Sequence, residues 1–388
     1  MRILARYAFI AAFLVLCLLP LASTVARVSI VPPVDENRKL AAPPAWTSLW
    51  TWPPDFAAVT QQADRWYTDH FGLRSLLIRL KTQVDLSIFR TSNRVHIGSD
   101  GWLFYRSVMD VEKPSVQALL GAREADILAG INAFGAALRA KGIELIIVPN
   151  LLADRFVPEK LPTSVPRLPA PPRFDHFLDR LAALPDISYL DGVAVLRRLQ
   201  QERPIFHKTD FHWNDPAAFE VARALVETIA RLERRTEPVW THKLEIETKP
   251  MSGWIARFMP VFRLPSEEAL FVKPTWTRSP AFIPLYNQGV FEYVARVTTP
   301  DPKLLPTTVV YGDSFFDGML RSGFDAYFQN LCHARVSHGL KLSGIARSLP
   351  PDAGYLVVEF IEVTTAVLQA FADKADLALA TEIIESRR

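Results

Sequence analysis

Residues 307–316 read Thr-Thr-Val-Val-Tyr-Gly-Asp-Ser-Phe-Phe and join an apolar, β-branched run to a polar turn. Apolar runs bounded by turn residues are typical of strands buried inside a sheet. We therefore predict a strand over residues 307–312, followed by a helix from Ser314. In a sheet of parallel strands, functional groups gather beyond the carboxyl ends of the strands, and Ser314 occupies that position.

Similar segments recur on both sides of this strand. Further strands are predicted at residues 144–148, 187–190, 334–337 and 355–360, with helices near residues 123–141, 174–184, 193–202 and 214–234. Apolar strands that alternate with helices predict an α/β fold with a mostly parallel sheet covered on both faces. Residues 238–300 mix short strand-like pieces with prolines, and we interpret them as a β-rich insertion.

A second motif, Thr209-Asp210-Phe211-His212-Trp213-Asn214, lies about a hundred residues before Ser314. Asp210 and His212 are two residues apart in an extended segment, so their side chains point to the same side. With Ser314, they supply the hydroxyl, the imidazole and the carboxylate that serine acyl transfer requires. The two motifs therefore predict one catalytic site.

Each motif also has an ordinary structural explanation. Asp313 or Ser314 could simply cap a helix, because Gly-Asp-Ser tripeptides are common in turns. Asp210 and His212 could form an ordinary loop pair, and a metal site would recruit His207 beside them. Zinc sites usually need three or four ligands, and the sequence contains no further ligand cluster. The metal interpretation is therefore the weaker one.

The N-terminus and the composition indicate an exported, folded protein. Arg2 and Arg6 precede an apolar stretch, which predicts a signal peptide cleaved after Ala26 or an uncleaved membrane anchor. Positive charge before such a stretch keeps the N-terminus in the cytoplasm and sends the rest across. The formal net charge of the 388 residues is +3, and 49% of them are hydrophobic. This composition predicts a sizeable core and argues against a nucleic-acid partner.

These features divide the chain into three parts. Residues 1–27 are assigned to the signal peptide or signal anchor. Residues 28–60 are rich in proline and tryptophan, and we interpret them as an extended collar. Residues 61–388 are predicted to form the catalytic domain, with the insertion at about residues 238–300.

Taken together, the motifs resemble the SGNH, or GDSL-type, hydrolase superfamily. In most members the aspartate and histidine follow the serine and are spaced Asp-x-x-His, whereas here they precede it and are spaced Asp-x-His. This order resembles the SGNH-like domain of the alginate O-acetyltransferase family. Other matching stretches are Glu36-Asn37-Arg38, Asp69-His70-Phe71 with Arg74, and residues 98–105. The resemblance covers nearly the whole chain after the apolar segment.

The resemblance implies a role for each residue of the site. Ser314 is expected to be the nucleophile, His212 the general base and Asp210 its orienting partner. The backbone N–H of Ser314 is the first candidate oxyanion donor. Asn150, at the end of a strand, is the second candidate and would alternatively cap a loop.

The chain departs from the family pattern in two places. The strand around Glu359 lacks the arginine expected soon after that glutamate, and Ser252-Gly253-Trp254 lacks an expected Gly-Asp pair. Both departures concern substrate contacts rather than the triad.

The resemblance also implies a fold, a reaction and partners. It implies a three-layer α/β/α SGNH-hydrolase-like domain in the periplasm, tethered to the inner membrane. The expected reaction is transfer of acetyl groups to hydroxyls of an exported polysaccharide through an acylated serine. A multi-spanning membrane acyltransferase would donate the acetyl groups, and no metal ion or organic cofactor is required.

Two other functions fit the same residues. A carbohydrate acetylesterase of this superfamily has an identical triad and differs only in admitting water to the acyl-enzyme. A non-catalytic glycan-binding or assembly protein would retain the site as a vestige, although the complete Ser/His/Asp set argues against this. The sequence does not indicate which polysaccharide, whether alginate, cellulose or another, would be modified.

Overall fold

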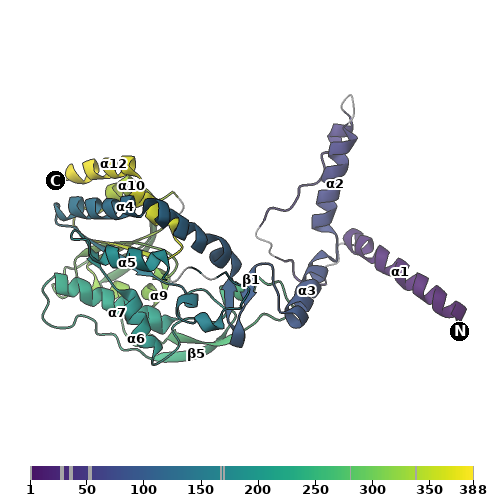
Figure 1. The fold of residues 1–388 in the computed structure, drawn as a ribbon, viewed down its shortest axis with the longest axis horizontal. Helices are drawn as coiled ribbons and strands as arrows, with labels where there is room; N and C mark the ends of the chain where they lie inside the picture. The colour runs from purple at the N-terminus through teal and green to yellow at the C-terminus, as the bar shows by residue number, and fades with distance from the viewer. Residues whose placement is uncertain are drawn as a thin grey trace. The chain divides into compact units, whose positions relative to one another are not determined.

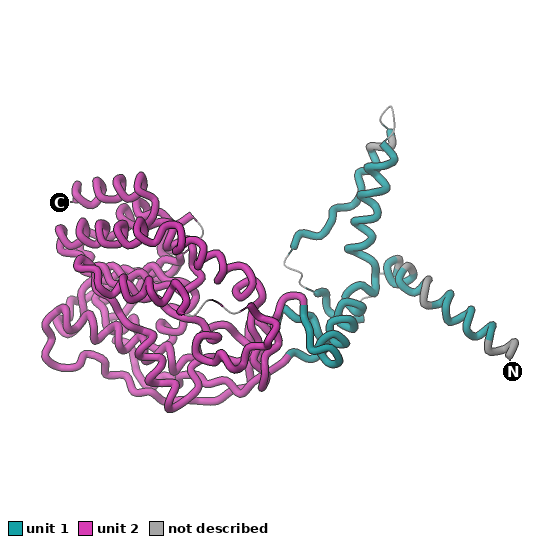
Figure 2. The backbone as a smooth tube through the Cα atoms, viewed as in Figure 1, with its two compact units in different colours: residues 1–92, 257–264 teal, residues 93–256, 265–388 magenta. Residues whose placement is uncertain are grey.

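The computed structural model of the protein describes residues 2–26, 30–34, 38–50, 55–166, 168, 171–279, 281–336 and 339–387. Glu36 and Asn37 of the N-terminal motif, part of the collar, and residue 27 lie outside the described residues. The chain divides into two compact units (Figure 2). The first comprises residues 1–92 and 257–264, and the second comprises residues 93–256 and 265–388. The larger unit thus begins at residue 93, whereas the domain expected from the sequence begins at residue 61.

A seven-stranded mixed sheet forms the centre of the larger unit (Figure 1). Its spatial order is β4 (Ser188–Tyr189), β3 (Glu144–Asn150), β11 (Ala353–Ile361), β9 (Thr307–Gly312), β10 (Asn330–Arg335), β8 (Phe291–Val297) and β7 (Phe282–Gln288). The first five strands pair in parallel, and β8 and β7 continue the sheet antiparallel. All six residues of β9 are buried, as its apolar sequence predicts.

Residues 238–300 are β-rich, but they do not form a separate insertion. β8 pairs with β10, with Val294 opposite Cys332, so β7 and β8 belong to the main sheet. Among the described residues of this region, β5 (Ile246–Met251) and β6 (Glu267–Val272) form a separate two-stranded sheet. Prolines break up the alternation of side chains in this region, which is why the sequence pattern did not distinguish the two pairs.

The helices of the larger unit fall into two sets, each packed within itself. The first is α4 (Lys113–Arg139), α5 (Arg173–Ala182), α10 (Leu342–Ser348), α11 (Thr365–Ala372) and α12 (Lys374–Glu385). The second is α6 (Gly192–Gln200), α7 (Asp215–Leu232) and α9 (Phe316–Arg321). In Figure 1, α4, α10 and α12 occupy the upper part of this unit, and α6 and α7 the lower part. Both α4 and α6 contact β3.

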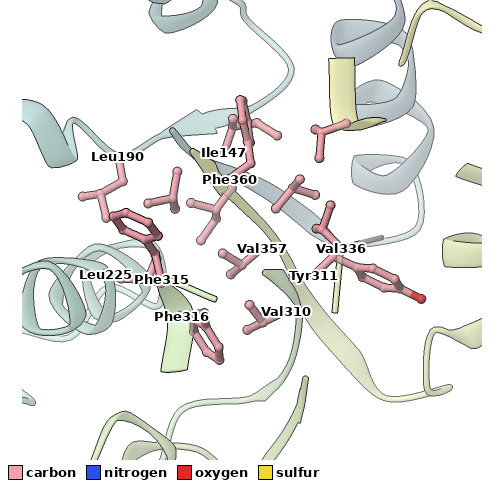
Figure 3. Packing of buried hydrophobic residues seen from close by; sticks show 14 of the residues in the cluster. Ile147, Leu190, Leu225, Val310, Tyr311, Phe315, Phe316, Val336, Val357 and Phe360 are labelled. Carbon is pink, nitrogen blue, oxygen red and sulfur yellow. The ribbon is translucent and has the colours of Figure 1, made fainter. Parts of the chain in front are cut away.

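The hydrophobic core lies between the strands and these helices (Figure 3). Ile147 of β3, Val310 of β9 and Val357 of β11 are completely buried. They are joined by Leu225 of α7 and Phe316 of α9, which are also completely buried. Each such side chain contributes about 1.5–3 kcal/mol on burial, so the core holds the central strands firmly. The carboxyl ends of β3, β9 and β11 are therefore fixed relative to one another.

Two smaller elements complete this unit. β1 (Val95–Ile97) and β2 (Leu103–Tyr105) form an antiparallel pair. Between them, Asp100 and Gly101 adopt positive φ angles of 52° and 82°. A one-turn helix, α8 (Trp254–Arg257), follows β5.

The smaller unit contains α1 (Arg2–Val25), α2 (Phe56–His70) and α3 (Arg74–Val84). Residues Arg6–Thr24 of α1 have a mean hydropathy of 2.1 and are long and apolar enough to cross a membrane, as a signal sequence also would be. Arg38 and Asp69, both from stretches that resemble the acetyltransferase family, form an ion pair here, with one nitrogen–oxygen distance of 2.9 Å.

Candidate active site

Ser314 lies in the turn that directly follows β9. The strand ends at Gly312 and α9 begins at Phe316, two residues later than the sequence predicts. The Ser314 side chain is half-buried. Because α9 has only six residues, its helix dipole contributes little here, and an oxyanion would depend on individual N–H groups.

The structure brings the three predicted residues together. Nε2 of His212 lies 2.7 Å from Oγ of Ser314, and Nδ1 of the same ring lies 2.7 Å from Oδ1 of Asp210. The distances place both ring nitrogens in hydrogen bonds, one to the hydroxyl and one to the carboxylate. With Nδ1 donating to Asp210, Nε2 is free to accept the serine proton. This is the geometry that a nucleophile, base and orienting carboxylate require.

Asp210 is held as a carboxylate by its neighbours. Its Oδ1 also accepts the backbone N–H of His212 at 3.1 Å, and its Oδ2 accepts the backbone N–H of Trp254 at 2.7 Å. Burial alone would raise the pKa of Asp210, but the hydrogen bonds from His212 and Trp254 lower it to about 2. The negative charge that orients His212 is therefore present throughout the neutral range.

Aromatic rings enclose the imidazole. The ring centroid of His212 lies 4.0 Å from that of Phe211 and 5.0 Å from that of Phe315. Trp213 is almost completely buried, and its indole N–H donates to the carbonyl of Phe315 at 3.0 Å. This bond joins the Asp-x-His segment directly to the serine turn. The enclosure limits the motion of His212 and excludes water from most of its surface.

Glu267, at the start of β6, fixes the segment that precedes Asp210. Its carboxylate accepts the backbone N–H of Lys208 at 2.8 Å. It also accepts both the backbone N–H and the hydroxyl of Thr209, each at 2.7 Å. Glu267 was not predicted as a site residue, because it lies within residues 238–300, where the sequence shows no clear period.

Gly253 allows a second segment to approach this loop. A Cβ atom at residue 253 would lie 2.5 Å from the carbonyl carbon and oxygen of Thr209, so a larger residue does not fit. The backbone N–H of Gly253 donates to the hydroxyl of Thr209 at 2.9 Å. This close approach places the N–H of Trp254 against Asp210. The Ser252-Gly253-Trp254 segment, where the sequence departs from the family pattern, thus contacts the triad.

Asp313 and Glu359 tie the serine turn to the end of β11. Asp313 accepts the backbone N–H groups of Phe315 at 2.9 Å and of Ile361 at 2.8 Å. Its own backbone N–H donates to Oε2 of Glu359 at 3.0 Å. Burial raises the pKa of Asp313 and raises that of Glu359, which is completely buried, well above its usual range. A buried acid within the apolar run of β11 was the available signal for Glu359.

Asn150, the second candidate oxyanion donor, is completely buried at the end of β3. Its Nδ2 donates to Oε1 of Glu359 at 2.5 Å, while its Oδ1 has no hydrogen-bond partner among the described residues. Asn150 is therefore linked to the serine turn through Glu359 rather than directly to Ser314. The backbone N–H of Ser314 has no acceptor in the part of the chain that the structure describes.

His207, the third residue of the metal interpretation, supports the loop instead. Its backbone N–H donates to the carbonyl of His212 at 3.4 Å, and its ring lies against Phe271 at 6.0 Å between centroids. The side chain is buried, and burial lowers the pKa of His207.

The surroundings of the site include two hollows and an exposed tryptophan, Trp254. A hollow of about 20 Å³ behind Asp210 is lined by apolar residues that include Tyr105, Phe211 and Ile255, and it is smaller than an acetyl group. A cavity of about 570 Å³ lies between α6 and α7, but no triad residue lines it. Trp254 is 43% exposed and packs edge-on against Phe211 at 5.3 Å. The partly exposed Ser314 and His212 lie on this same aromatic surface.

Residues 95–335 match the model of a protein family described as the SGNH hydrolase-like domain of the acetyltransferase AlgX. The chain is also similar to the probable alginate O-acetylase AlgJ of Pseudomonas syringae pv. tomato. The two are 28% identical over 206 residues, or 52% of this chain and 51% of the relative. The corresponding protein of Pseudomonas aeruginosa is 24% identical over 197 residues, 50% of this chain and 49% of that one. The chain thus spans about half the length of the curated relatives it matches.

One solved structure shows a similar fold at low sequence identity. PatB1 of Bacillus cereus superposes with a TM-score of 0.51 and 12% identity, covering 71% of this chain and 99% of that one. The O-acetyltransferase domain of Pseudomonas putida AlgJ gives a TM-score of 0.47 and 19% identity, covering 76% of this chain and 99% of that one.

Proposed function

This chain belongs to the family of SGNH hydrolase-like, AlgX-type acetyltransferase domains, and on that premise we propose that it is a polysaccharide O-acetyltransferase. The observation that carries the proposal is the continuous hydrogen-bonded chain from Ser314 through His212 to Asp210. Relatives named alginate O-acetylases support a polysaccharide as the acceptor. The two helix sets are consistent with a three-layer α/β/α arrangement.

The first half of the reaction forms an acetyl-enzyme. His212 accepts the proton of Ser314 through Nε2 as Oγ attacks the carbonyl carbon of an acetyl ester. The bond from that carbon to the donor oxygen then breaks, and the donor leaves with the proton that His212 returns. Asp210 stabilises the imidazolium that exists between these steps.

The second half transfers the acetyl group to a sugar. His212 takes the proton of a glycan hydroxyl, whose oxygen attacks the acetyl-serine carbonyl. The bond to Oγ of Ser314 breaks, and His212 returns the proton to that oxygen. The acetylated sugar leaves and the free serine is restored, so atoms and charges balance over the cycle.

Developing negative charge on the carbonyl oxygen needs hydrogen-bond donors. The backbone N–H of Ser314 is the first donor that we propose. Glu359 acts as a positioning residue, because it holds the N–H of Asp313, one residue before the nucleophile. Asn150 contributes by orienting Glu359, and we do not assign it a direct contact with the oxyanion.

Aromatic residues beside the triad suit a carbohydrate acceptor. Trp254 exposes part of its indole, and Tyr105 and Phe211 pack edge-on against that ring. Aromatic faces of this kind offer an apolar surface to the C–H groups of a sugar ring, while their neighbours bond its hydroxyls. We therefore propose that Trp254 receives the acceptor.

The proposed location is the periplasm, with α1 as the tether to the inner membrane. Arg2 and Arg6 precede the apolar helix, an arrangement that directs the following residues across the membrane. Acetyl-CoA does not occur outside the cytoplasm, so the proposed donor is a multi-spanning membrane acyltransferase that passes acetyl groups across.

The test is to trap the acetyl-enzyme. The full-length protein in detergent would be incubated with a chromogenic acetyl ester, beside Ser314→Ala and His212→Ala. Intact mass spectrometry and peptide mapping should find one acetyl group on Ser314, and both variants should lose about 10⁴-fold or more in rate. Absence of turnover and adduct in folded wild-type protein would refute the proposal and favour a non-catalytic glycan-binding role. An adduct that only water resolves, even with polysaccharide present, would identify an esterase.

A further inference from the structure

The helix α3 presents apolar side chains to the outside along one face. Leu77, Leu80 and Val84 are 45%, 51% and 38% exposed, and Ile88 in the following turn is 69% exposed. The spacing of three, four and four residues puts all of them on the same side of the helix, where the exposed Lys81 also lies. Phe89, next to Ile88, is also exposed. In a protein surrounded only by water, a surface helix normally packs such an apolar face against the protein interior.

The opposite face of α3 is polar and is the one that packs within the smaller unit. The hydroxyl of Ser75 accepts the backbone N–H of Val34 at 3.4 Å. Arg79 donates to the carbonyl of Val261 at 2.9 Å, and Gln83 accepts the backbone N–H of Phe262 at 3.3 Å. The packing of this unit therefore leaves the apolar face exposed.

The start of α3 lies beside the end of the apolar helix α1. The backbone N–H of Gly72 donates to the hydroxyl of Thr24 at 2.8 Å. A Cβ atom at residue 72 would lie 2.3 Å from Oγ of Ser23, so only glycine permits this approach. Thr24 is also the last residue of the membrane-length segment of α1. If α1 spans a bilayer, α3 begins at the bilayer surface.

The charge around α3 suits a membrane surface with anionic lipids. Between residues 74 and 92 the chain carries four basic residues, Arg74, Arg79, Lys81 and Arg90, and one acidic residue, Asp85. Lys81 pairs with Asp85 at 2.5 Å, and Arg79 belongs to the packed face. Helices with an apolar face and basic flanks lie in the interface plane, with the apolar face about 5–10 Å into the boundary between headgroups and acyl chains. Basic residues near that surface are attracted to anionic headgroups.

We propose that α3 is an interfacial helix, which lies on the bilayer that α1 spans and buries Leu77, Leu80, Val84 and Ile88 among the acyl chains of anionic phospholipids. The inference depends on the proposed membrane location of α1, but it does not depend on the acetyltransfer chemistry. It assigns the smaller unit a second attachment to the membrane, beyond the single helix.

Spin labels on the full-length protein would test this. Single cysteines would be placed at Leu77, Leu80, Val84 and Ile88, in a chain whose Cys17 and Cys332 are replaced by alanine. Labels at Leu14 of α1 and at the exposed Asp64 of α2 serve as lipid and water references. The protein would be reconstituted into bilayers containing equal parts of phosphatidylcholine and phosphatidylglycerol. Collision rates with oxygen, which concentrates in lipid, would be compared with those of a water-soluble nickel chelate.

The four α3 labels should resemble Leu14, with oxygen collisions several-fold above those of the nickel chelate, and a label at Thr82 should not. If the collision rates of the α3 labels instead resemble those at Asp64 while the label at Leu14 still reports lipid, the interfacial helix is refuted. The membrane-spanning role of α1 is then still supported. If Leu14 also resembles Asp64, both are refuted. Labels shielded from both reagents would mean that protein covers this face. Spin–spin broadening that grows with protein density would then identify a second copy.

Discussion

Oδ1 of Asp210 lies 2.7 Å from Nδ1 of His212 and 3.1 Å from the backbone nitrogen of the same residue. One carboxylate oxygen thus fixes both the ring and the main chain of the residue two positions later. The orientation of the base is set within a single tripeptide. The rest of the molecule then has only to bring Ser314 to the opposite nitrogen of the ring.

Replacing Asp210 with asparagine should impair catalysis with little change in shape. An amide that turns its oxygen away cannot hold the Nδ1–H tautomer, so Nε2 of His212 would no longer accept the serine proton. We expect kcat for acetyl-ester turnover to fall about 10²- to 10⁴-fold, with KM nearly unchanged. Steady-state kinetics check this, and circular dichroism controls for folding. A variant with wild-type kcat would show that His212 is oriented by other contacts.

The pH dependence of stability should also reflect the hydrogen bonds that Asp210 accepts from His212. The pKa of Asp210 is lowered from 3.8 to about 2, so the carboxylate contributes stability that is present above about pH 4 and lost as the pH falls through about 2. The contribution is at most about 2 kcal/mol. Wild-type protein and Asp210→Asn would be unfolded in urea between about pH 7 and pH 3. The difference between their free energies of unfolding should narrow below about pH 4. A difference that widens there would contradict the lowered pKa of Asp210.

The proximity of Asp210, His212 and Ser314 could be predicted from the sequence because each of the two motifs carries a local signal. Asp210 and His212 share one extended segment, and Ser314 follows an apolar strand that only a sheet interior accommodates. The parallel centre of the sheet follows from the same kind of pattern. The proline-rich strands of residues 238–300 gave no clear period, so the pairing of β8 with β10 was not predicted.

The supporting residues were missed because their roles arise only from tertiary packing. Glu267 is 58 residues from Thr209 in sequence, and Glu359 is 46 residues from Asp313. Nothing near either glutamate specifies its partner. The exposed face of α3 illustrates the same limit. The sequence of this helix does not show that its polar face is the packed one.

We expect Glu359 to support catalysis and stability through its hydrogen bonds and not through a negative charge. Burial raises the pKa of Glu359 well above its usual range, which favours the uncharged acid that glutamine resembles. Glutamine keeps one oxygen for the backbone N–H of Asp313, and its NH2 group can donate to Oδ1 of Asn150 once that amide turns over. Glu359→Gln should therefore keep near-wild-type kcat and equal or greater stability, because it avoids the loss of stability that an acid with a raised pKa incurs as pH increases. Glu359→Ala leaves the N–H groups of Asp313 and Asn150 unsatisfied and should lose about 10²-fold in kcat.

The comparison between the two Glu359 variants separates these roles. Kinetics with the acetyl ester and urea unfolding would be measured on both proteins. If the glutamine variant is as impaired as the alanine variant at every pH, the negative charge itself is required, and the positioning role is wrong.

Substitutions of Trp254 should weaken binding of the acceptor and leave the formation of the acetyl-enzyme unchanged. Both Trp254→Ala and Trp254→Phe keep the backbone N–H that bonds Asp210, so acetylation of Ser314 should continue at the wild-type rate. Loss of the indole face should cost about 1–2 kcal/mol of acceptor binding, or about 5- to 30-fold in acceptor KM, with phenylalanine less affected. Acetyl transfer to an oligosaccharide gives the acceptor KM, and ester hydrolysis measured on the same proteins gives the rate at which the acetyl-enzyme forms. An unchanged acceptor KM in both variants would place the sugar elsewhere.

Lys113 should be indispensable to the stability of the larger unit. Its Nζ is buried and lies 2.6 Å from Asp154 and 2.7 Å from Glu362, at the end of β11. Burial alone would lower the pKa of Lys113, but these carboxylates raise it, so the ammonium stays charged at neutral pH. Removing it takes the ammonium away from two buried acids, of which Glu362 keeps only the weaker pair with Arg155 at 3.5 Å. Breaking a buried pair typically costs about 3–5 kcal/mol.

Lys113→Met would be compared with Lys374→Met, whose lysine is 78% exposed and pairs with Asp126 at 2.9 Å. The surface variant should lose no more than about 1 kcal/mol. Urea unfolding of the full-length proteins in detergent, followed by tryptophan fluorescence, provides the free energies. Because Glu362 also accepts the backbone N–H of Leu152, just after β3, Lys113→Met should further lower acetyl-ester turnover by loosening the strand ends behind the serine turn. Equal stability losses in the two variants would show that water reaches the Lys113 cluster and solvates its acids.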